Sequence, residues 1–535
     1  MVIDGRTLPR DQHLETDVCI IGAGPAGIAI ARELSGTPFR VCLLESGGVQ
    51  PDPETQALYR GRLVGHQYFR LDDCRVRRFG GGTNRWGGWT RAMDPIDFEH
   101  RSWVSDSGWP IPWEEVDRFS DRARALLNIP SQAEAMRDAT GRGGRHVLPL
   151  PPDRIETGLL QFSPIIDFGA AYREALFAAA NVQTILYANV TAITTTAGGG
   201  AVDRLTVRTL AGNTFTVSAR AIVLAAGAIE NARLLLQSNV GNDHDLVGRF
   251  FMEHLHVRCG VFVPNPGVDC SFYDEKGRRG REPMAWFILP PRVVRDQRLQ
   301  AWSASLKQVR EAPVDWLLAA QSPAYSSALA LAEAVVRGRG SARWAERLGR
   351  SLGGFDDVLR AIGARSSLGP HTGRLFEIFV RAEQGPNRES RVMLNGERDR
   401  LGLPQVDLDW RITEQDIASV RAGVALLAEA CAGAGVGQVF VPPYGEDVPA
   451  IEAINGGWHQ MGTTRMARDA KTGVVDEHCR VHGVANLFVA GSAVFPSCGF
   501  ANPTFTILAL ALRLADHLRA RLAAPAAQVA ALSST

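Results

Sequence analysis

The sequence predicts an α/β fold built around a parallel sheet, and three observations lead to this prediction. Residues 17–45 show an apolar run, a glycine turn, a helical segment and a second apolar run. Residues 221–227 form another apolar run that ends in small residues and precedes a helical segment. Near the C-terminus, residues 487–490 lead into a glycine turn, and a long helix starts beyond Asn502. Strands that alternate with helices are typical of parallel sheets with crossover helices.

Gly22, Gly24 and Gly27 lie between the first strand and the first helix, in the spacing of a dinucleotide-binding turn. Gly22 permits the tight turn, Gly24 lets the backbone approach a pyrophosphate, and Gly27 lets helix and strand pack closely. Glu45 ends the next strand, 23 residues after Gly22, where an acid bonds an adenosine ribose. This part of the chain predicts a bound dinucleotide, and the motif leaves open whether that is FAD or NAD.

A second glycine-rich segment, residues 79–89, carries two tryptophans among its glycines. Glycines give a backbone the freedom to wrap closely around a flat ligand. A flexible surface loop is the alternative, but such loops seldom contain tryptophan. The composition therefore favours contact with a ligand.

His459 and Asn502 lie in two stretches near the C-terminus, residues 458–466 and 499–504, and are 43 positions apart. A histidine takes up a proton near neutral pH, and an asparagine side chain bonds a hydroxyl without changing charge. The pair has what is needed to remove the proton of an alcohol, provided that a hydride acceptor lies nearby. A buried core histidine is the alternative interpretation of His459, and the Asn502 segment together with the dinucleotide turn favours the catalytic one.

The composition is typical of an enzyme without nucleic-acid or membrane partners. The length of 535 residues predicts two domains, and the formal net charge of +1 gives no reason to expect nucleic acid or an anionic membrane surface. No run reaches the ~18 uncharged apolar residues of a membrane span, and the charged N-terminus does not form a secretory signal. The eight cysteines are scattered, which predicts reduced thiols and a cytoplasmic location.

These motifs together resemble the glucose-methanol-choline oxidoreductase family, and the resemblance covers nearly the whole chain. It rests on the glycine turn at 22–27, on the segment 81–88, on the stretch around His459 and on the Ala-Asn-Pro-Thr sequence at 501–504. The His/Asn pair is more similar to the pyranose oxidase and sugar dehydrogenase branch than to the glucose oxidase branch, which uses two histidines. The resemblance implies FAD, a Rossmann-like FAD-binding domain with an inserted α+β substrate domain, and oxidation of an alcohol to a carbonyl.

The resemblance also implies roles for single residues. His459 matches the base that takes the hydroxyl proton, Asn502 bonds the same hydroxyl, and Gln384 and Trp458 are expected to contact the substrate. Arg85 stands where covalently flavinylated pyranose oxidases carry a histidine, so FAD is expected to be bound non-covalently. The expected cofactor contacts are Gly22, Gly24, Pro25, Ala26, Gly27, Glu45, Gly81, Gly82, Thr83, Asn84, Gly88, Val190, Ala226, Gly227, Gly491, Ser492, Asn502, Pro503 and Thr504.

The two domains are expected to be interleaved along the chain. The FAD-binding domain is assigned to residues 1–100, 157–258 and 450–525, the substrate domain to 101–156 and 259–449, and a disordered tail to 526–535.

Within the substrate domain, a mostly antiparallel sheet with a helical excursion is expected. Residues 375–380 and 390–394 predict antiparallel strands joined through 383–387, and residues 308–364 predict helices. His254 and His256 have the i, i+2 spacing of some metal sites. No further ligands support a metal, so they are expected on a strand or turn near the crossing between the domains, and no metal site is predicted.

Two other functions stay open at this point. A nicotinamide-dependent dehydrogenase would leave the glycine loop at 80–88 and His459 without a role. A non-redox lyase on the same flavin fold would use the histidine for acid–base work alone. The expected substrate is a sugar, glycoside, amino sugar or other polyhydroxylated metabolite, with a simple aliphatic or benzylic alcohol as the alternative. The electron acceptor, oxygen or another, and the oligomeric state are not predicted.

Overall fold

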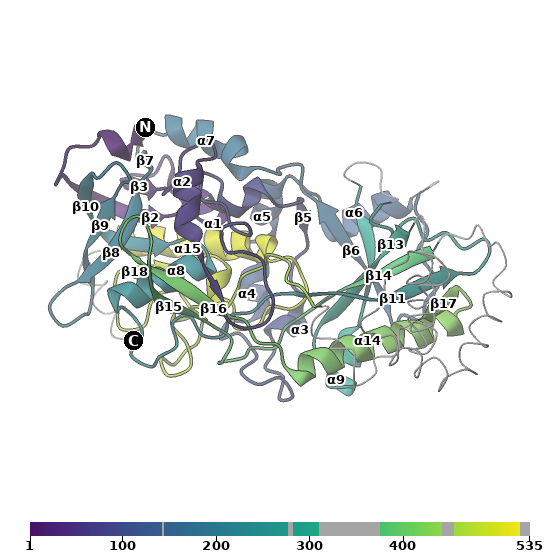
Figure 1. Cartoon of the computed structure of the whole chain (residues 1–535). Coiled ribbons are helices and arrows are strands. Elements are labelled where there is room, and N and C mark those ends of the chain that lie inside the picture. Colours follow the sequence, from purple (N-terminus) through teal and green to yellow (C-terminus); the bar gives the residue numbers. More distant parts are fainter. Residues whose placement is uncertain (142–143, 277–281, 310–374, 441–453, 525–535) are drawn as a thin grey trace, which may run out of the picture.

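The computed structural model describes residues 1–141, 144–276, 282–309, 375–440 and 454–524, and these residues form two large sheets that lie side by side (Figure 1). The expected helical excursion at 308–364 falls almost wholly outside the described residues, and the expected tail at 526–535 does so entirely. Among the helices that the structure describes, none has the length and apolarity needed to cross a membrane.

The first sheet has eight strands and is mostly parallel. Its order is β1 (Val2–Asp4), β7 (Val182–Leu186), β3 (Val41–Leu44), β2 (His13–Ile21), β10 (Thr214–Leu224), β9 (Val202–Arg208) and β8 (Asn189–Thr195), with β18 (Leu487–Val489) also paired to β10. The pairs from β1 through to β10, and β10 with β18, are parallel, and β8, β9 and β10 are antiparallel. The parallel α/β prediction is confirmed for this part of the chain.

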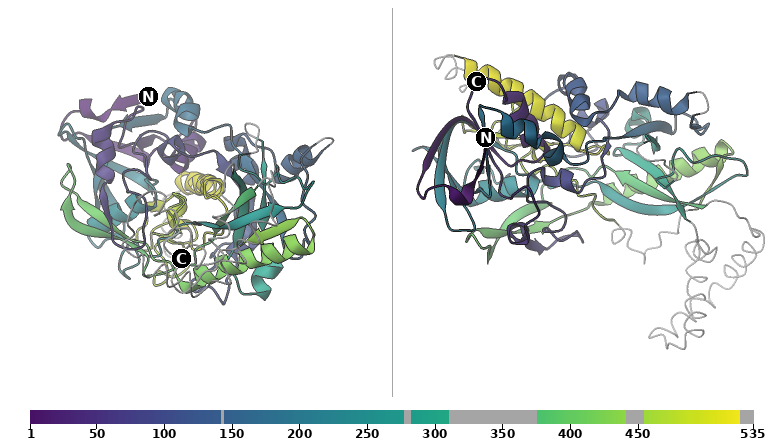
Figure 2. Two further views of the ribbon diagram at one scale, coloured as in Figure 1. Left: turned by 45° about the vertical axis from the view of Figure 1, so that its right-hand side comes forward. Right: turned by 90° about the horizontal axis from the view of Figure 1, so that it is seen from above.

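The central strands are apolar because helices cover both faces of the sheet. Every residue of β3 and the last four of β2 are buried, as parallel strands between helical layers require. Helix α1 (Pro25–Leu34) packs against α15 (Thr504–Ala523), so the first and last helices of the chain are neighbours (Figure 2). Helices α7 (Phe168–Ala178) and α8 (Ala228–Ser238) complete the described helices that pack on this sheet or its edges.

Strand β10 is longer than the apolar run at 221–227 that the sequence indicated. Residues 214–224 form one continuous strand, which begins seven residues before that run. Its first half pairs with β9 in antiparallel register, and its second half runs between β2 and β18 in parallel register. One strand thus serves a hairpin at one end and the buried parallel core at the other.

In the described residues the second sheet has seven strands, and every pair of adjacent strands in it is antiparallel. Its order is β17 (Gly437–Phe440), β11 (Leu255–Pro264), β14 (Leu375–Ala382), β13 (Trp302–Val309), β12 (Met284–Ile288), β6 (Glu156–Phe162) and β5 (Trp89–Thr90). Strand β6 brings residues of the range 157–258 into this sheet, while most strands come from the range 259–449.

A long helix, α14 (Glu414–Gly433), lies along the second sheet (Figure 1). It begins with a capping box, in which the Thr413 side chain and the Asp416 carboxylate each accept from the other's backbone N–H. Gly423 faces Trp302 so closely that a Cβ there would lie 2.6 Å from the indole. The helix therefore seats directly on strand β13.

The third sheet corrects a predicted strand pair. Strands β14 and β15 (Arg391–Arg398) were expected to pair, but β15 pairs with β16 (Pro404–Asp409), which pairs with β4 (Gly61–Leu63). Both edges of β14 are occupied by β11 and β13. In the segment between β14 and β15, Glu383 is buried in an ion pair with Arg101.

The remaining helices are short and connect these layers. They are η1 (Gly5–Thr7), α2 (Pro53–Gln56), η2 (Ala57–Tyr59), η3 (Gly81–Asn84), α3 (Pro95–Phe98), α4 (Trp113–Asp117), α5 (Ser120–Leu127), α6 (Gln132–Thr140), α9 (Pro291–Asp296) and η4 (Ser492–Val494).

Candidate active site

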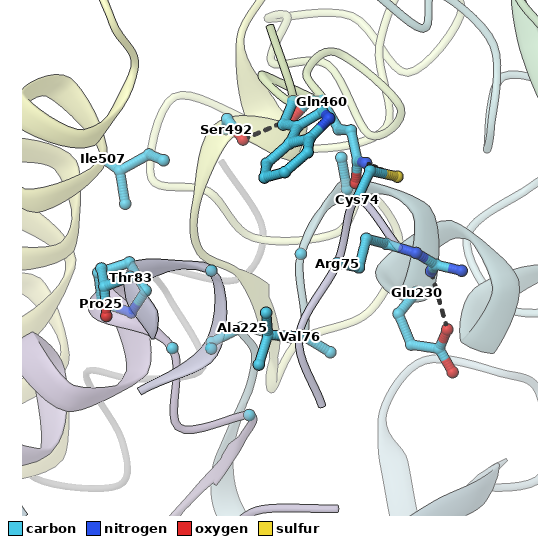
Figure 3. Close-up of a pocket in the computed structure, with 18 of the residues that line it drawn as sticks. Pro25, Cys74, Arg75, Val76, Thr83, Ala225, Glu230, Gln460, Ser492 and Ile507 are labelled. Atoms are coloured by element: carbon cyan, nitrogen blue, oxygen red, sulfur yellow. Dashed lines mark hydrogen bonds and ion pairs between the residues drawn. The ribbon is translucent and has the colours of Figure 1, made fainter. Parts of the chain in front are cut away.

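One cavity of about 480 Å³ joins the glycine turn at 22–24 to the loop that carries His459. Figure 3 shows part of its lining, with Pro25 and Thr83 close together and the Arg75–Glu230 pair apart from them. The cavity is lined by the first sheet's strand ends and by residues of the second sheet. Ligands of open parallel sheets bind at the carboxyl ends of the strands, so this is where a dinucleotide is expected.

The glycine turn has the geometry that a pyrophosphate needs. Gly22 has a φ of +104°, and a Cβ on Gly27 would lie 1.9 Å from the Gly22 carbonyl oxygen, so neither position accepts a side chain. Helix α1 starts at Pro25 with Gly24 as its N-cap and no side-chain cap. Its free N–H groups are a ready-made site for phosphate oxygens.

Glu45 lies at the end of β3 and lines the cavity. Its Oε2 accepts a hydrogen bond from the Ala23 backbone at 2.9 Å, and its Oε1 accepts one from the Gly47 backbone at 2.8 Å. Burial raises the pKa of this carboxyl, and the two backbone donors offset part of that rise. The carboxyl thus ties the glycine turn to the loop after β3 beside the cavity.

The loop at 80–88 is fastened onto the glycine turn. The Gly80 N–H donates to the Ala23 carbonyl at 2.8 Å, and a Cβ on Gly81 would lie 2.9 Å from the Gly24 Cα. The Thr83 hydroxyl donates to the Gly80 carbonyl at 2.6 Å. The glycine turn at 22–27 and the glycine-rich loop at 80–88 therefore form one continuous wall of the cavity.

The C-terminal segment closes the cavity with a third backbone turn and a helix start. The Ser492 hydroxyl donates to the Gln460 carbonyl at 2.7 Å, which joins the turn after β18 to the His459 loop (Figure 3). Helix α15 follows Pro503, its N-cap, without a side-chain cap, and Pro503 and Thr504 line the cavity. The positive end of a helix 20 residues long thus faces the cavity and favours negative charge there.

His459 and Asn502, predicted as a pair, lie together in this cavity. The Asn502 Nδ2 is 3.3 Å from the His459 Nε2, and the Asn502 Oδ1 has no partner among the described residues. On the other side of the ring, the His459 Nδ1 is 2.8 Å from the Nδ1 of His254. The His254 Nε2 is 3.4 Å from the Cys498 carbonyl oxygen.

With neutral rings, one arrangement of protons satisfies all three contacts. The Asn502 amide donates to the His459 Nε2, the His459 Nδ1–H donates to His254, and the His254 Nε2–H donates to Cys498. Burial, the neighbouring His254 and Arg381 hold the pKa of His459 well below its usual range, and burial lowers that of His254 to about 4. The arrangement leaves the lone pair of His459 on Nε2, toward Asn502.

Glu253 anchors the backbone of the His459 loop. Its carboxyl accepts the Gly457 N–H, and the Glu253 N–H donates to the Gln384 Oε1 at 3.0 Å. Burial raises the pKa of Glu253 to about 8, although backbone donors of residues 457–459 lower it in part. The loop is therefore held from behind by a buried acid that no sequence motif singled out.

His256 lies beside the pair and was not predicted as a site residue. A Cβ on Gly457 would lie 2.5 Å from the His256 ring and 3.0 Å from the His459 ring, so glycine is what lets the two rings meet there. His256 lines the cavity with Trp286 and Arg381 from the second sheet. The i, i+2 spacing of His254 and His256 was the available signal: His256 lies on strand β11, and His254 directly precedes that strand.

The predicted cofactor contacts divide into those that line the cavity and those that support it. Lining residues are Gly22, Gly24, Pro25, Glu45, Gly81, Gly82, Thr83, Val190, Ala226, Gly227, Ser492, Asn502, Pro503 and Thr504. Ala26, Gly27, Asn84, Gly88 and Gly491 are not part of the lining. Asn84, for example, directs its amide to the Phe79 and Gly81 carbonyls.

The two predicted substrate contacts differ in position. Trp458 lines the cavity, is 42% exposed and adopts a left-handed φ of 62°. Gln384 is fully buried behind the site, where it accepts from the Trp410 Nε1 at 2.9 Å and donates to the Arg411 carbonyl at 2.7 Å. Its amide is committed to structural bonds with residues that are distant in sequence, so it supports the Glu253 backbone instead of lining the cavity.

A charged cluster at the far end of the cavity was also missed. Arg75, Arg77 and Arg233 surround Glu230 at 3.1–3.4 Å. Burial raises the pKa of Glu230, but the three guanidinium groups outweigh it and hold the pKa at about 2. The cluster joins the segment before the glycine loop to helix α8.

The described residues contain no group of three or more His, Cys, Asp or Glu side chains arranged to hold a metal ion.

Comparison with known proteins agrees with this geometry. A family model described as FAD dependent oxidoreductase matches residues 17–260, and one described as GMC oxidoreductase matches residues 386–511. The chain is 23% identical to 2-methyl-1,2-propanediol dehydrogenase from Mycolicibacterium austroafricanum, over 95% of this chain and 96% of that protein. It is 25% identical to paromamine 6'-oxidase from Streptomyces fradiae, over 95% and 92%.

Among solved structures, pyridoxine 4-oxidase from Mesorbium loti superimposes with a TM-score of 0.56 at 18% identity, over 94% of this chain and 98% of that one. Fold, site and comparisons together define an FAD-dependent oxidoreductase that acts on alcohols. The family to which these similarities point is the glucose-methanol-choline (GMC) oxidoreductase family.

Proposed function

We propose that this enzyme oxidises a hydroxyl group of a polyhydroxylated metabolite to a carbonyl, with His459 as the base and Asn502 as its partner. The observation that carries the proposal is the ordered row Asn502–His459–His254, in which one His459 nitrogen faces the cavity and the other is held from behind. Bound FAD supplies the hydride acceptor.

The first step is removal of the hydroxyl proton. The His459 Nε2 carries the lone pair and lies beside Asn502, so a substrate hydroxyl between them donates to the imidazole and accepts from the amide. The depressed pKa of His459 keeps the ring neutral, and hence able to act as a base, at neutral pH.

The second role belongs to His254, which positions the base. Its Nδ1 accepts from the His459 Nδ1–H, which fixes the tautomer and helps to bear the positive charge after His459 has taken the proton. The uncapped start of α15 at the cavity favours any negative charge that builds up there.

FAD is proposed to be held without a covalent bond. Arg85 lines the cavity and its guanidinium donates to the Asp73 carbonyl, so this position offers no nucleophile to a flavin. Acid precipitation tests the proposal directly: FAD should leave the polypeptide and appear in the supernatant. Yellow colour that stays with the precipitate would contradict it.

The proposed division into an FAD-binding and a substrate domain is supported by the two large sheets, which both contribute residues to the cavity. The substrate is proposed to be a sugar-like alcohol. Two relatives that match 95% of this chain support this proposal, since their names give a diol and paromamine as substrates. Oxygen or another acceptor reoxidises the enzyme.

Anaerobic mixing of the enzyme with a panel of alcohols tests the function. A sugar-like alcohol should bleach the oxidised flavin spectrum, and this reduction should occur without added NAD or NADP. A non-redox lyase would instead convert its substrate while the flavin stays oxidised.

A further inference from the structure

One face of the second sheet forms the wall of the cavity next to His459. His256 on β11 and Arg381 on β14 are direct cross-strand partners, so their side chains share this face. Trp286 on β12 lines the same part of the cavity. The three side chains come from strands that are brought together only by the register of the sheet.

Arg381 is held rigidly in this wall. Its guanidinium lies 4.4 Å from the Phe379 ring centroid and 4.8 Å from that of Trp286. It donates to the Glu275 carboxylate at 2.6 Å and to the Ser305 hydroxyl at 2.9 Å. Arg381 lines the cavity and Glu275 does not, so the pair presents its positive end to a ligand.

Unpaired polar atoms surround the same space. Among the described residues, the Trp286 Nε1, the His256 Nε2 and the Asn502 Oδ1 have no hydrogen-bond partner. Trp286 is 1% exposed, so its donor is buried at the cavity wall. Buried polar groups are normally bonded, and a set that contains both a donor and acceptors fits ligand hydroxyls, which do both.

An ammonium group has no matching partner in this space. The acids in the described lining are Glu45 and Glu230. Glu45 is bonded to two backbone N–H groups, and Glu230 is surrounded by three arginines. A cationic substrate would therefore meet the guanidinium side of the Arg381–Glu275 pair, and the described lining offers no free carboxylate to bind it.

We propose that Trp286, His256 and Arg381 form a subsite for an uncharged polyhydroxylated ring, and that Arg381 excludes substrates with an ammonium group on that ring. The inference rests on the proposed alcohol oxidation and names its substrate class as neutral glycosides in place of amino sugars. The indole offers its unbonded Nε1–H donor, and the guanidinium donates to ring hydroxyls.

The test compares three probes of one shape: methyl β-D-glucopyranoside, its 2-amino-2-deoxy analogue and the corresponding glucuronide. Anaerobic flavin reduction gives kcat/KM for each in the wild type, in Arg381→Lys and in the double variant Arg381→Met/Glu275→Gln. The double variant removes both members of the buried ion pair, because removing Arg381 alone would leave the Glu275 charge without its partner.

In the wild type, the glucoside should be at least about tenfold better than the amino analogue while the amine is protonated. The gap should close as the pH rises above the pKa of that amine. Arg381→Lys should keep the gap, and the double variant should reduce it to less than about threefold. A purely structural role would lower both rates together and leave their ratio unchanged, which would overturn the proposal.

Other outcomes separate the subsite from the proposed function. A glucuronide more than tenfold better than the glucoside would overturn the preference for an uncharged ring. If 2-methyl-1,2-propanediol reduced the flavin while the glucoside neither reduced it nor changed its spectrum, alcohol oxidation would be supported and the subsite would be contradicted. A glucoside that perturbs the flavin spectrum without reducing it would support the subsite and contradict the proposed function.

Discussion

At the Glu45 end of the cavity the backbone forms the binding surface, whereas at the His459 end side chains from distant strands form it. The first end consists of two glycine segments in direct contact, joined by the Gly80 N–H to the Ala23 carbonyl. The second combines His459 and Asn502 with His256 and other side chains of the second sheet, and His254 contacts His459 from behind. The first end has the geometry of a general cofactor site, and the second is the end that we propose to bind the substrate.

The difference gives a rule for variants of this enzyme. Changes at the Glu45 end should weaken FAD binding and leave the reduction of bound FAD almost unaltered. Changes at the His459 end should do the opposite. A variant that altered both properties together would show that the two ends are coupled.

The largest effect is expected for His459→Ala, which should slow flavin reduction by ~10²–10⁴-fold because it removes a general base. FAD content should stay that of the wild type, because His459 belongs to the side-chain end. Anaerobic stopped-flow mixing measures the rate. His482→Ala is a matched control, since His482 bonds the Ala467 carbonyl and does not line the cavity. Wild-type reduction by His459→Ala would mean that the proton leaves by another route.

Glu45→Ala should weaken FAD binding by about 1.5–3 kcal/mol, the range for a hydrogen bond to a charged group. The FAD that remains bound should be reduced at the wild-type rate. Glu45→Gln is the matched control, because it keeps the shape and an acceptor oxygen and should lose less. Fluorescence of released FAD, followed by dialysis and titration, gives the affinity. An unchanged affinity in Glu45→Ala would remove Glu45 from the cofactor site.

The contrast between the two ends also explains how much of the site could be predicted from the sequence. Glycine spacing reports backbone geometry directly, so the segments at 22–27 and 79–89 were each predicted to contact a ligand, and both segments contribute to the cavity. His459 and Asn502 were found because each lies in a short local motif. Gln384 was expected to contact the substrate, but it does not line the cavity. Its side-chain amide bonds Trp410 and Arg411 instead, and these partners are distant from the His459 motif in sequence.

The site residues that the sequence did not predict were missed for one common reason. His256 and Arg381 reach the site through the pairing of β11 with β14, and that register appears in no local pattern. His254 directly precedes β11. Strand β15 shows the same limit, since it was expected beside β14 and is excluded because both edges of β14 are taken. Local motifs predicted the His459–Asn502 pair and the glycine segments, whereas non-local strand pairing places His256 and Arg381 in the cavity wall.

Asn502→Ala should cost less than the loss of the base. It removes one neutral hydrogen bond, worth about 0.5–1.5 kcal/mol, which corresponds to a reduction about twofold to tenfold slower. The FAD content should remain that of the wild type if the side chain serves the substrate end alone. A clear loss of FAD in this variant, measured by absorbance after gel filtration, would show that Asn502 also belongs to the cofactor end.

The smallest effect is expected in the pH profile of flavin reduction between pH 6.5 and 8, which should be flat in the wild type. A base acts when it is unprotonated, and burial together with His254 and Arg381 holds the pKa of His459 well below 6.5. The rate should therefore fall only at a pH lower than an ordinary histidine would give. In His254→Ala, water that enters the vacated space relieves part of the burial, so the acid limb should move up toward 6.5 while the plateau falls. Stopped-flow reduction across this range, with FAD content as the control, gives both quantities. An acid limb at 6.5 in the wild type would mean that His459 is hydrated in the working enzyme. An unshifted limb in His254→Ala would show that His254 does not control the protonation of the base.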